Sequence, residues 1–242
     1  MNYTLVINFE AWVLVRLHVD AVVYACATRH PVIAGNWVRD VPHHYIGASM
    51  SDLQRQAVAL VRNHGYEYRE EPFKLASGQT SHDYIDGKVA VETGESLTLV
   101  SRAIVELAER HGVVFDAVGG LTMGADALAH GVAIVARCTW FSVRKERKSR
   151  GHDRWIEGHR LQRGDRVLLV DDVVTSGGSI QLACSRVTET GALVVGVIPM
   201  VDRGDQGAIW FSAREIPYIP LMTYKDLEIE PVGRAALAQA TR

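Results

Sequence analysis

The spacing of apolar residues predicts alternating helices and strands from residue 51 onward. The segment that begins at Ser51 resembles a helix capping box, and apolar residues at helical spacing follow it as far as Gly65. A second helix is expected over 97–108, with Gly112 just beyond its end. Four short apolar runs predict buried strands: 113–118, 132–136, 167–170 and 193–198.

The strand at 167–170 is followed by a predicted helix that ends near Thr190, and then by the strand at 193–198. This order predicts a βαβ unit and therefore a parallel sheet. Ligands of such sheets bind beyond the carboxyl ends of the strands. We therefore expect an α/β fold, a central parallel sheet flanked by helices, with its site after residue 170.

Composition narrows the class of protein. The chain has 242 residues, of which 48% are hydrophobic, and a formal net charge of −2, so it is globular and is not expected to bind nucleic acid. The apolar stretch 3–27 is interrupted by charged residues, so neither a membrane span nor a signal peptide is expected. The three cysteines are far apart and lack metal-site spacing, which favours a reducing cytoplasm.

The candidate chemistry begins where the strand 167–170 ends. Two adjacent carboxylates are followed by a turn of glycine and hydroxyl residues that opens a helix. Glycines let backbone N–H groups approach a phosphate, and the helix N-terminus is partly positive, whereas the acids suit the vicinal hydroxyls of a ribose. A P-loop is excluded because it needs a lysine after the second glycine. The residues expected to bind a ribose 5-phosphate are Asp171, Asp172, Val173, Val174, Thr175, Ser176, Gly177, Gly178 and Ser179.

This segment resembles the 5-phosphoribosyl-1-pyrophosphate (PRPP) motif of the type I phosphoribosyltransferases, and within them the orotate phosphoribosyltransferases. Other segments that resemble the family are 73–81, the aromatic strand 84–86, the pyrophosphate loop 118–126 and the motif 201–203. The resemblance implies the type I fold with a small N-terminal hood. It also implies transfer of ribose 5-phosphate from PRPP to orotate, giving orotidine 5′-monophosphate and pyrophosphate in pyrimidine biosynthesis.

A basic run at 144–150 holds five cations and one acid, which by itself is typical of a solvated surface loop. The resemblance implies instead that the loop 144–158 reaches the active site of the partner subunit in a homodimer and stabilises the leaving pyrophosphate. It assigns catalytic roles to Arg144, Lys145 and Lys148, alongside Asp172. Arg150 stands at the family's loop histidine, with His152 two places later, and either can supply that charge.

Two further roles follow from the resemblance. Arg203 is expected to bind the carboxylate of orotate, although an ordinary surface arginine paired with Asp202 or Asp205 would give the same sequence. The expected cofactor is Mg²⁺, held mainly by PRPP, with no direct protein ligand assigned. A lysine that many members carry in the pyrophosphate loop is Met123 here.

Two alternatives stay open. The enzyme could use another base, because the positions near the base depart most from the family, or the chain could bind PRPP without catalysis, as a regulator. Residues 50–242 are expected to form the phosphoribosyltransferase domain. Residues 1–49 match no part of the family, and we expect a non-catalytic extension, with Met50 as an alternative start.

Overall fold

The computed structural model divides the chain into two units, Met1–Ala48 and Ser49–Arg242. In the first unit, strands β1 (Val13–Leu17) and β2 (Ala21–Ala25) pair antiparallel. The second unit holds the candidate site. The residues that the structure describes are 13–17, 21–25, 49–75, 78–146 and 155–232.

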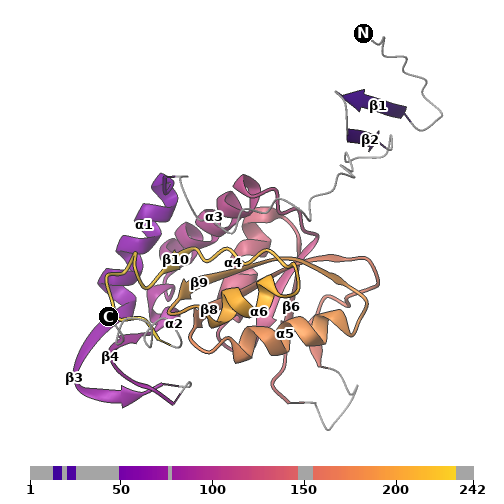
Figure 1. Ribbon diagram of the computed structural model, residues 1–242. Coiled ribbons are helices and arrows are strands. Elements are labelled where there is room, and N and C mark those ends of the chain that lie inside the picture. Colours follow the sequence, from indigo (N-terminus) through magenta and orange to yellow (C-terminus); the bar gives the residue numbers. More distant parts are fainter. Residues whose placement is uncertain (1–12, 18–20, 26–48, 76–77, 147–154, 233–242) are drawn as a thin grey trace. The chain divides into compact units, whose positions relative to one another are not determined.

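The larger unit is built on a sheet whose described strands run in the order β10-β9-β8-β5-β6-β7 (Figure 1). All neighbouring pairs are parallel except β6 and the edge strand β7, which are antiparallel. Strand β8 lies inside the sheet, between β5 and β9. The strands are β5 (Ala117–Leu121), β6 (Thr139–Val143), β7 (Ile156–Gly158), β8 (Arg166–Val174), β9 (Leu193–Asp202) and β10 (Met222–Thr223).

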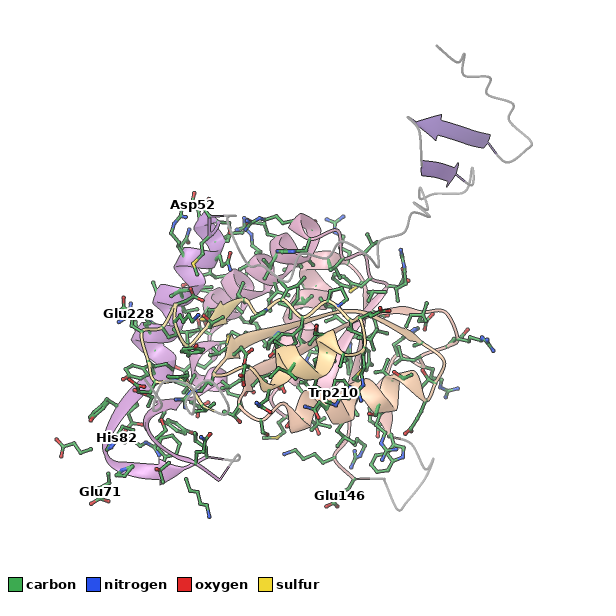
Figure 2. The ribbon with its side chains drawn as sticks, in the orientation of Figure 1. Asp52, Glu71, His82, Glu146, Trp210 and Glu228 are labelled. Atoms are coloured by element: carbon green, nitrogen blue, oxygen red, sulfur yellow. The ribbon has the colours of Figure 1, made fainter. Side chains whose placement is uncertain are left out.

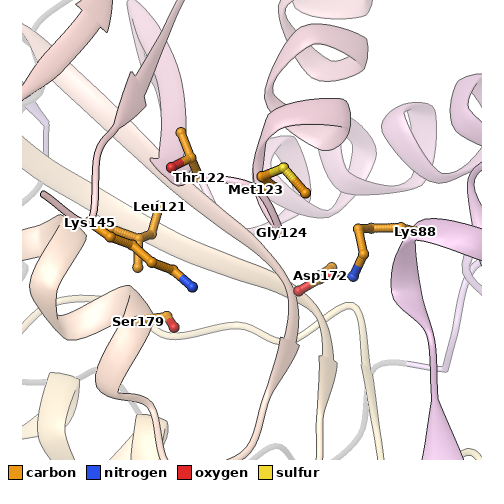
Figure 3. A pocket seen from close by; sticks show the side chains of 8 residues that line it. All are labelled: Lys88, Leu121, Thr122, Met123, Gly124, Lys145, Asp172 and Ser179. Carbon is orange, nitrogen blue, oxygen red and sulfur yellow. Dashed lines mark hydrogen bonds and ion pairs between the residues drawn. The ribbon is translucent and has the colours of Figure 1, made fainter.

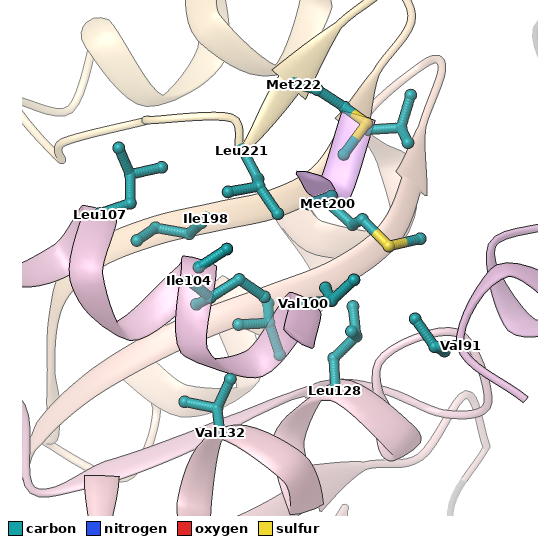
Figure 4. Close-up of a cluster of buried hydrophobic side chains, with 14 of the residues drawn as sticks. Val91, Val100, Ile104, Leu107, Leu128, Val132, Ile198, Met200, Leu221 and Met222 are labelled. Carbon is teal, nitrogen blue, oxygen red and sulfur yellow. The ribbon is translucent and has the colours of Figure 1, made fainter. Parts of the chain in front are cut away.

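Helices cover both faces of this sheet, and each layer buries its own core. On one face lie α1 (Asp52–Leu60), α3 (Gly94–Arg110) and α4 (Asp126–Ala136), and on the other lie α5 (Gly178–Thr188) and α6 (Gln206–Ser212). Figure 4 shows the first core, where Ile104 of α3 and Leu128 of α4 pack with Ile198 and Met200 of β9. The sheet is therefore held rigidly between two apolar layers.

A small hairpin precedes the sheet and forms the N-terminal hood. After a π-helical turn (Val61–Gly65) that extends α1, strand β3 (Tyr66–Lys74) pairs antiparallel with β4 (Thr80–Ile85). Glu71 and His82 mark the hairpin in Figure 2. The short helix α2 (Gly87–Ala90) follows, capped by the side chain of Asp86.

The structure confirms most of the predicted elements and corrects two of them. The capping box is confirmed, since Ser51 Oγ accepts a hydrogen bond from the N–H of Gln54 at 3.1 Å. The predicted strand at 132–136 is wrong, because these residues are the second half of α4. Val132 and Ala133 are buried where α4 packs against the sheet and α3, but Ile134 is 78% exposed, so this apolar run continues onto the outer face of the helix. A short apolar run does not by itself distinguish a helix from a buried strand. The strand predicted at 113–118 lies instead at Ala117–Leu121.

Among the residues that the structure describes, no helix combines the length and the apolar character that a bilayer crossing requires.

Candidate active site

The carboxyl half of β8 brings the two predicted acids to the edge of the core. Asp171 is buried, with 4% of its surface exposed, and its Oδ1 accepts the N–H of Asp172 at 3.1 Å. Asp172 is half-buried, and its Oδ1 accepts the N–H of Val173 at 2.7 Å. Burial, together with the adjacent charge of Asp172, raises the pKa of Asp171 to about 7. Each acid thus has one oxygen fixed by the main chain.

The predicted phosphate loop connects β8 to α5. Gly177, the N-cap of α5, has a φ of +78°, a conformation that glycine adopts without strain. Thr175 is half-buried, whereas Ser176 and Ser179 are exposed and their hydroxyls are accessible to a ligand. The first N–H groups of α5 have no partner inside the helix and suit an anion. The loop therefore has the chemistry of a phosphate site.

Val173 and Val174 belong to the strand, not to the loop. The Val174 side chain is buried in the second core, and its carbonyl accepts the N–H of Arg203 at 2.9 Å. These valines therefore support the loop, and their expected part in binding ribose 5-phosphate stays a prediction.

A cavity of about 300 Å³ lies beside the acids (Figure 3). Lys88 points toward Asp172, with Nζ 3.4 Å from Oδ2 of Asp172 and 3.6 Å from Oδ1 of Asp86, and Lys145 enters from the other side. Burial lowers the pKa of Lys88, but the two carboxylates outweigh it, so that its pKa is raised and the ammonium stays charged. The lining residues are Lys88, Leu121, Thr122, Met123, Gly124, Lys145, Asp172 and Ser179.

The start of the basic run lies at a second cavity of about 400 Å³, lined by Thr122, Met123, Arg144, Lys145 and Glu146. Arg144 forms an ion pair with Glu157 of β7 at 3.5 Å, and its N–H donates to the carbonyl of Trp155 at 2.8 Å. Lys145 is exposed. The other candidates of this run, Lys148, Arg150 and His152, lie outside the described residues.

Arg203 is buried, not on the surface, and it is not paired with Asp202 or Asp205 among the ion pairs of the described residues. Its terminal nitrogens donate to the carbonyl of Asp83 at 2.7 Å and to Oγ of Ser81 at 3.2 Å, both on β4. Its Nε is buried without a hydrogen-bond partner. Arg203 thus joins the hairpin to the end of β9.

Three residues of the site were missed in the sequence. Gly87 and Gly124 pack so tightly that an added Cβ would lie 2.7 Å from Cβ of Asp172 and 2.5 Å from its Oδ1, respectively. The glycine-rich run 119–124 was a signal for the second of these positions. No motif marks Lys88, whose place depends on a contact across 84 positions of sequence.

Comparisons with known proteins agree with this geometry. A model of the phosphoribosyl transferase domain matches residues 91–212. Orotate phosphoribosyltransferase from Thermosynechococcus vestitus is 37% identical over 185 residues, which cover 74% of this chain and 95% of the relative. The chain belongs to the orotate phosphoribosyltransferase family. The enzyme from Pyrococcus furiosus is 42% identical over 136 residues, covering 56% of this chain and 74% of that one.

Solved structures extend the family relation to the fold. The crystal structure of orotate phosphoribosyltransferase from Mycobacterium tuberculosis in complex with PRPP has a TM-score of 0.60 and 29% sequence identity, and the match covers 73% of this chain and 99% of that one. The fold is that of the type I phosphoribosyltransferases, as the sequence predicts. In family terms, β8 and the loop after it form the PRPP motif, and the hairpin β3–β4 is the hood.

Proposed function

We propose that this chain transfers the 5-phosphoribosyl group of PRPP to N1 of orotate, giving orotidine 5′-monophosphate and pyrophosphate, a step of pyrimidine biosynthesis. N1 attacks the anomeric carbon and gives up its proton to the solvent, and the bond from that carbon to pyrophosphate breaks, the leaving group taking the bonding electrons. One observation carries the proposal: β8 places a buried and a half-buried acid immediately before a phosphate loop, at a cavity that Lys88 and Lys145 enter.

Most of the catalysis in this proposal is positioning and electrostatics. Asp171 and Asp172 accept hydrogen bonds from the ribose hydroxyls, and the loop from Thr175 to Ser179 binds the 5′-phosphate. Arg144, Lys145 and Lys148 stabilise the charge that builds on pyrophosphate as it leaves. The adjoining cavities of about 300 and 400 Å³, which share Thr122, Met123 and Lys145, give space for this group beside the acids.

Magnesium fits the site as a companion of the substrate. Among the described residues, no three Asp, Glu, His or Cys side chains gather into a metal site. Mg²⁺ usually keeps several waters and takes one or two carboxylates together with substrate phosphates, and Asp172 at the cavity offers such a carboxylate. When bound, the ion would neutralise negative charge on the pyrophosphate.

Turnover assays test which base the enzyme accepts as its substrate. Purified full-length chain is incubated with PRPP, Mg²⁺ and, in separate reactions, orotate, uracil, adenine and hypoxanthine, and nucleotide formation is followed by chromatography. The proposal expects orotidine 5′-monophosphate from orotate and little product from the other bases. Turnover of a purine alone would overturn it in favour of another type I enzyme, and PRPP binding without any turnover would favour a regulator.

We further propose a cytoplasmic homodimer in which the loop 144–158 completes the partner's site. The hydrogen bond between Arg144 and Trp155 supports this, because it closes the base of the loop at the rim of the second cavity. Mixing the inactive variants Lys148→Ala and Asp172→Asn tests it. Hybrid dimers that share sites regain about a quarter of the wild-type activity at equal mixing, whereas sites made by one subunit regain none.

A further inference from the structure

Lys88 has a main chain that is fixed and a side chain that is accessible. Helix α2 packs so closely on β8 that a Cβ on Gly87 would lie 2.7 Å from Cβ of Asp172 and 3.0 Å from Cε of Met200. On its other side, a Cβ on Gly65 would lie 2.8 Å from Cβ of Ala90. The Lys88 side chain is nevertheless 55% exposed and lines the 300 Å³ cavity. The fold thus holds a cation at a fixed place on the cavity wall.

Lys88 contacts Oδ2 of Asp172, the same oxygen that is suited to accept a hydrogen bond from a ribose hydroxyl. Oδ1 of Asp172 is already bonded to the N–H of Val173, so Oδ2 is the atom that meets Lys88 and the atom suited to accept a substrate hydroxyl. The Lys88 ammonium lies 3.4 and 3.6 Å from its two carboxylates, which are long contacts for a charged pair. Exposed pairs of this kind contribute little, so Lys88 can exchange them at small cost.

The loop residues 122–124, which line the same cavity, have no charged side chain that could bind an anion. Met123 is 71% exposed and stands between the cations with a neutral side chain. Of the residues that line the 300 Å³ cavity, Lys88 and Lys145 carry the positive charge. A lysine provides three donors on a flexible stem, which suits an anion that arrives and leaves.

We propose that Lys88 binds the pyrophosphate group of PRPP, exchanging its bond to Asp172 for one to a phosphate oxygen when the ribose hydroxyls take Oδ2. This inference rests on the proposed function for its substrate. It assigns to α2, the short helix that follows the hairpin, a charge contact with the leaving group.

The test compares ligands with and without pyrophosphate. Binding of pyrophosphate and of ribose 5-phosphate, each with Mg²⁺, is measured by titration calorimetry for wild type, Lys88→Met and Lys88→Arg in the full chain. Lys225→Met is the matched control, since Lys225 is exposed and does not line either cavity. Because a hydrogen bond to a charged group is lost, Lys88→Met should weaken pyrophosphate binding by about 10- to 100-fold. Lys88→Arg should restore most of it, and ribose 5-phosphate and the control should change less than about twofold.

Two results would overturn the inference. If Lys88→Met binds pyrophosphate with the affinity of the wild type, Lys88 does not contact this group. If the affinity for ribose 5-phosphate falls as much as that for pyrophosphate, Lys88 acts only through Asp172. Lys88→Gln provides the same comparison if Lys88→Met does not fold. An enzyme that binds PRPP but rejects orotate refutes the proposed function and leaves this comparison intact. Conversely, normal orotate turnover with unchanged pyrophosphate binding in Lys88→Met refutes only the role of Lys88.

Discussion

Replacing Gly124 by alanine places a methyl group against the acid pair. The added Cβ would lie 2.5 Å from Oδ1 of Asp172 and 2.9 Å from Oδ1 of Asp171. Non-bonded atoms reach their optimum at about 3.5 Å, so Asp172 or the loop must move by about 1 Å. Asp172 cannot retreat freely, because the same Oδ1 accepts the N–H of Val173 at 2.7 Å. The substitution therefore moves the group that receives the ribose.

The size of the effect follows from this displacement. A shift of about 1 Å in a positioned group can cost about 100-fold in rate. We expect Gly124→Ala to lower kcat/KM for PRPP by about 100-fold, with the melting temperature within a few degrees of wild type. The φ of Gly124 is not in the left-handed region, so alanine fits the backbone itself.

Steady-state kinetics with orotate and varied PRPP measures the loss, and thermal melting confirms that the variant is folded. Gly94→Ala is the control, since a Cβ on Gly94 meets no atom within 4 Å. It should retain wild-type kinetics. A folded Gly124→Ala enzyme whose kcat/KM stays within about threefold of wild type would refute the claim that the fit of this loop against the acids sets their position.

Three other predictions concern buried and basic groups. Burial raises the pKa of Asp202 from 3.8 to about 6, so this carboxyl costs stability as the pH rises from about 4 to 6. The free energy of unfolding of Asp202→Asn should therefore rise relative to that of the wild type across this pH range, by at most about 3 kcal/mol. Urea unfolding at several pH values measures it, and a difference that does not change with pH contradicts the prediction. Arg203→Met removes two buried hydrogen bonds from a charged donor to β4 and should cost about 1–3 kcal/mol in urea unfolding, while an unchanged midpoint argues against its role in holding the hairpin. Lys148→Ala should lower kcat at least about tenfold with a smaller change in KM for PRPP, whereas unchanged turnover rules out a catalytic role for Lys148.

The sequence predicted the βαβ unit and the acid pair because both depend on local order. A strand, two acids and a glycine turn are contiguous, and the strand delivers them to one edge of the sheet. The error at 132–136 has a physical reason: the exposed position of this part of α4, Ile134, is also apolar, so the run lacks the polar face that reveals a helix. Gly119 and Gly120 suggested a loop, yet they lie in β5, where a Cβ would meet Phe141 and Val170.

Contacts between distant segments could not be predicted in this way. Lys88 reaches Asp172 because α2 packs against β8, and the buried Arg203 finds two of its acceptors on β4. Neither contact leaves a periodic pattern in the sequence. The type of site could therefore be read from adjacent residues, whereas the cation at the acid pair and the partners of the arginine required the tertiary structure.

The place of β8 inside the sheet has a consequence for hydrogen exchange. Its backbone pairs with β9 from Arg166 to Val174, and with β5 on the other side over Val167 to Leu169. Amides in such a strand exchange with solvent mainly through global unfolding, whereas less protected segments also exchange through local opening. We expect the amides of Val167 to Leu169 to be among the slowest in the chain. Asp171 lies two residues beyond this doubly paired segment, so the acids are attached to a part of β8 that local fluctuations do not open, and the ribose would meet a preformed pair of acceptors at each turnover.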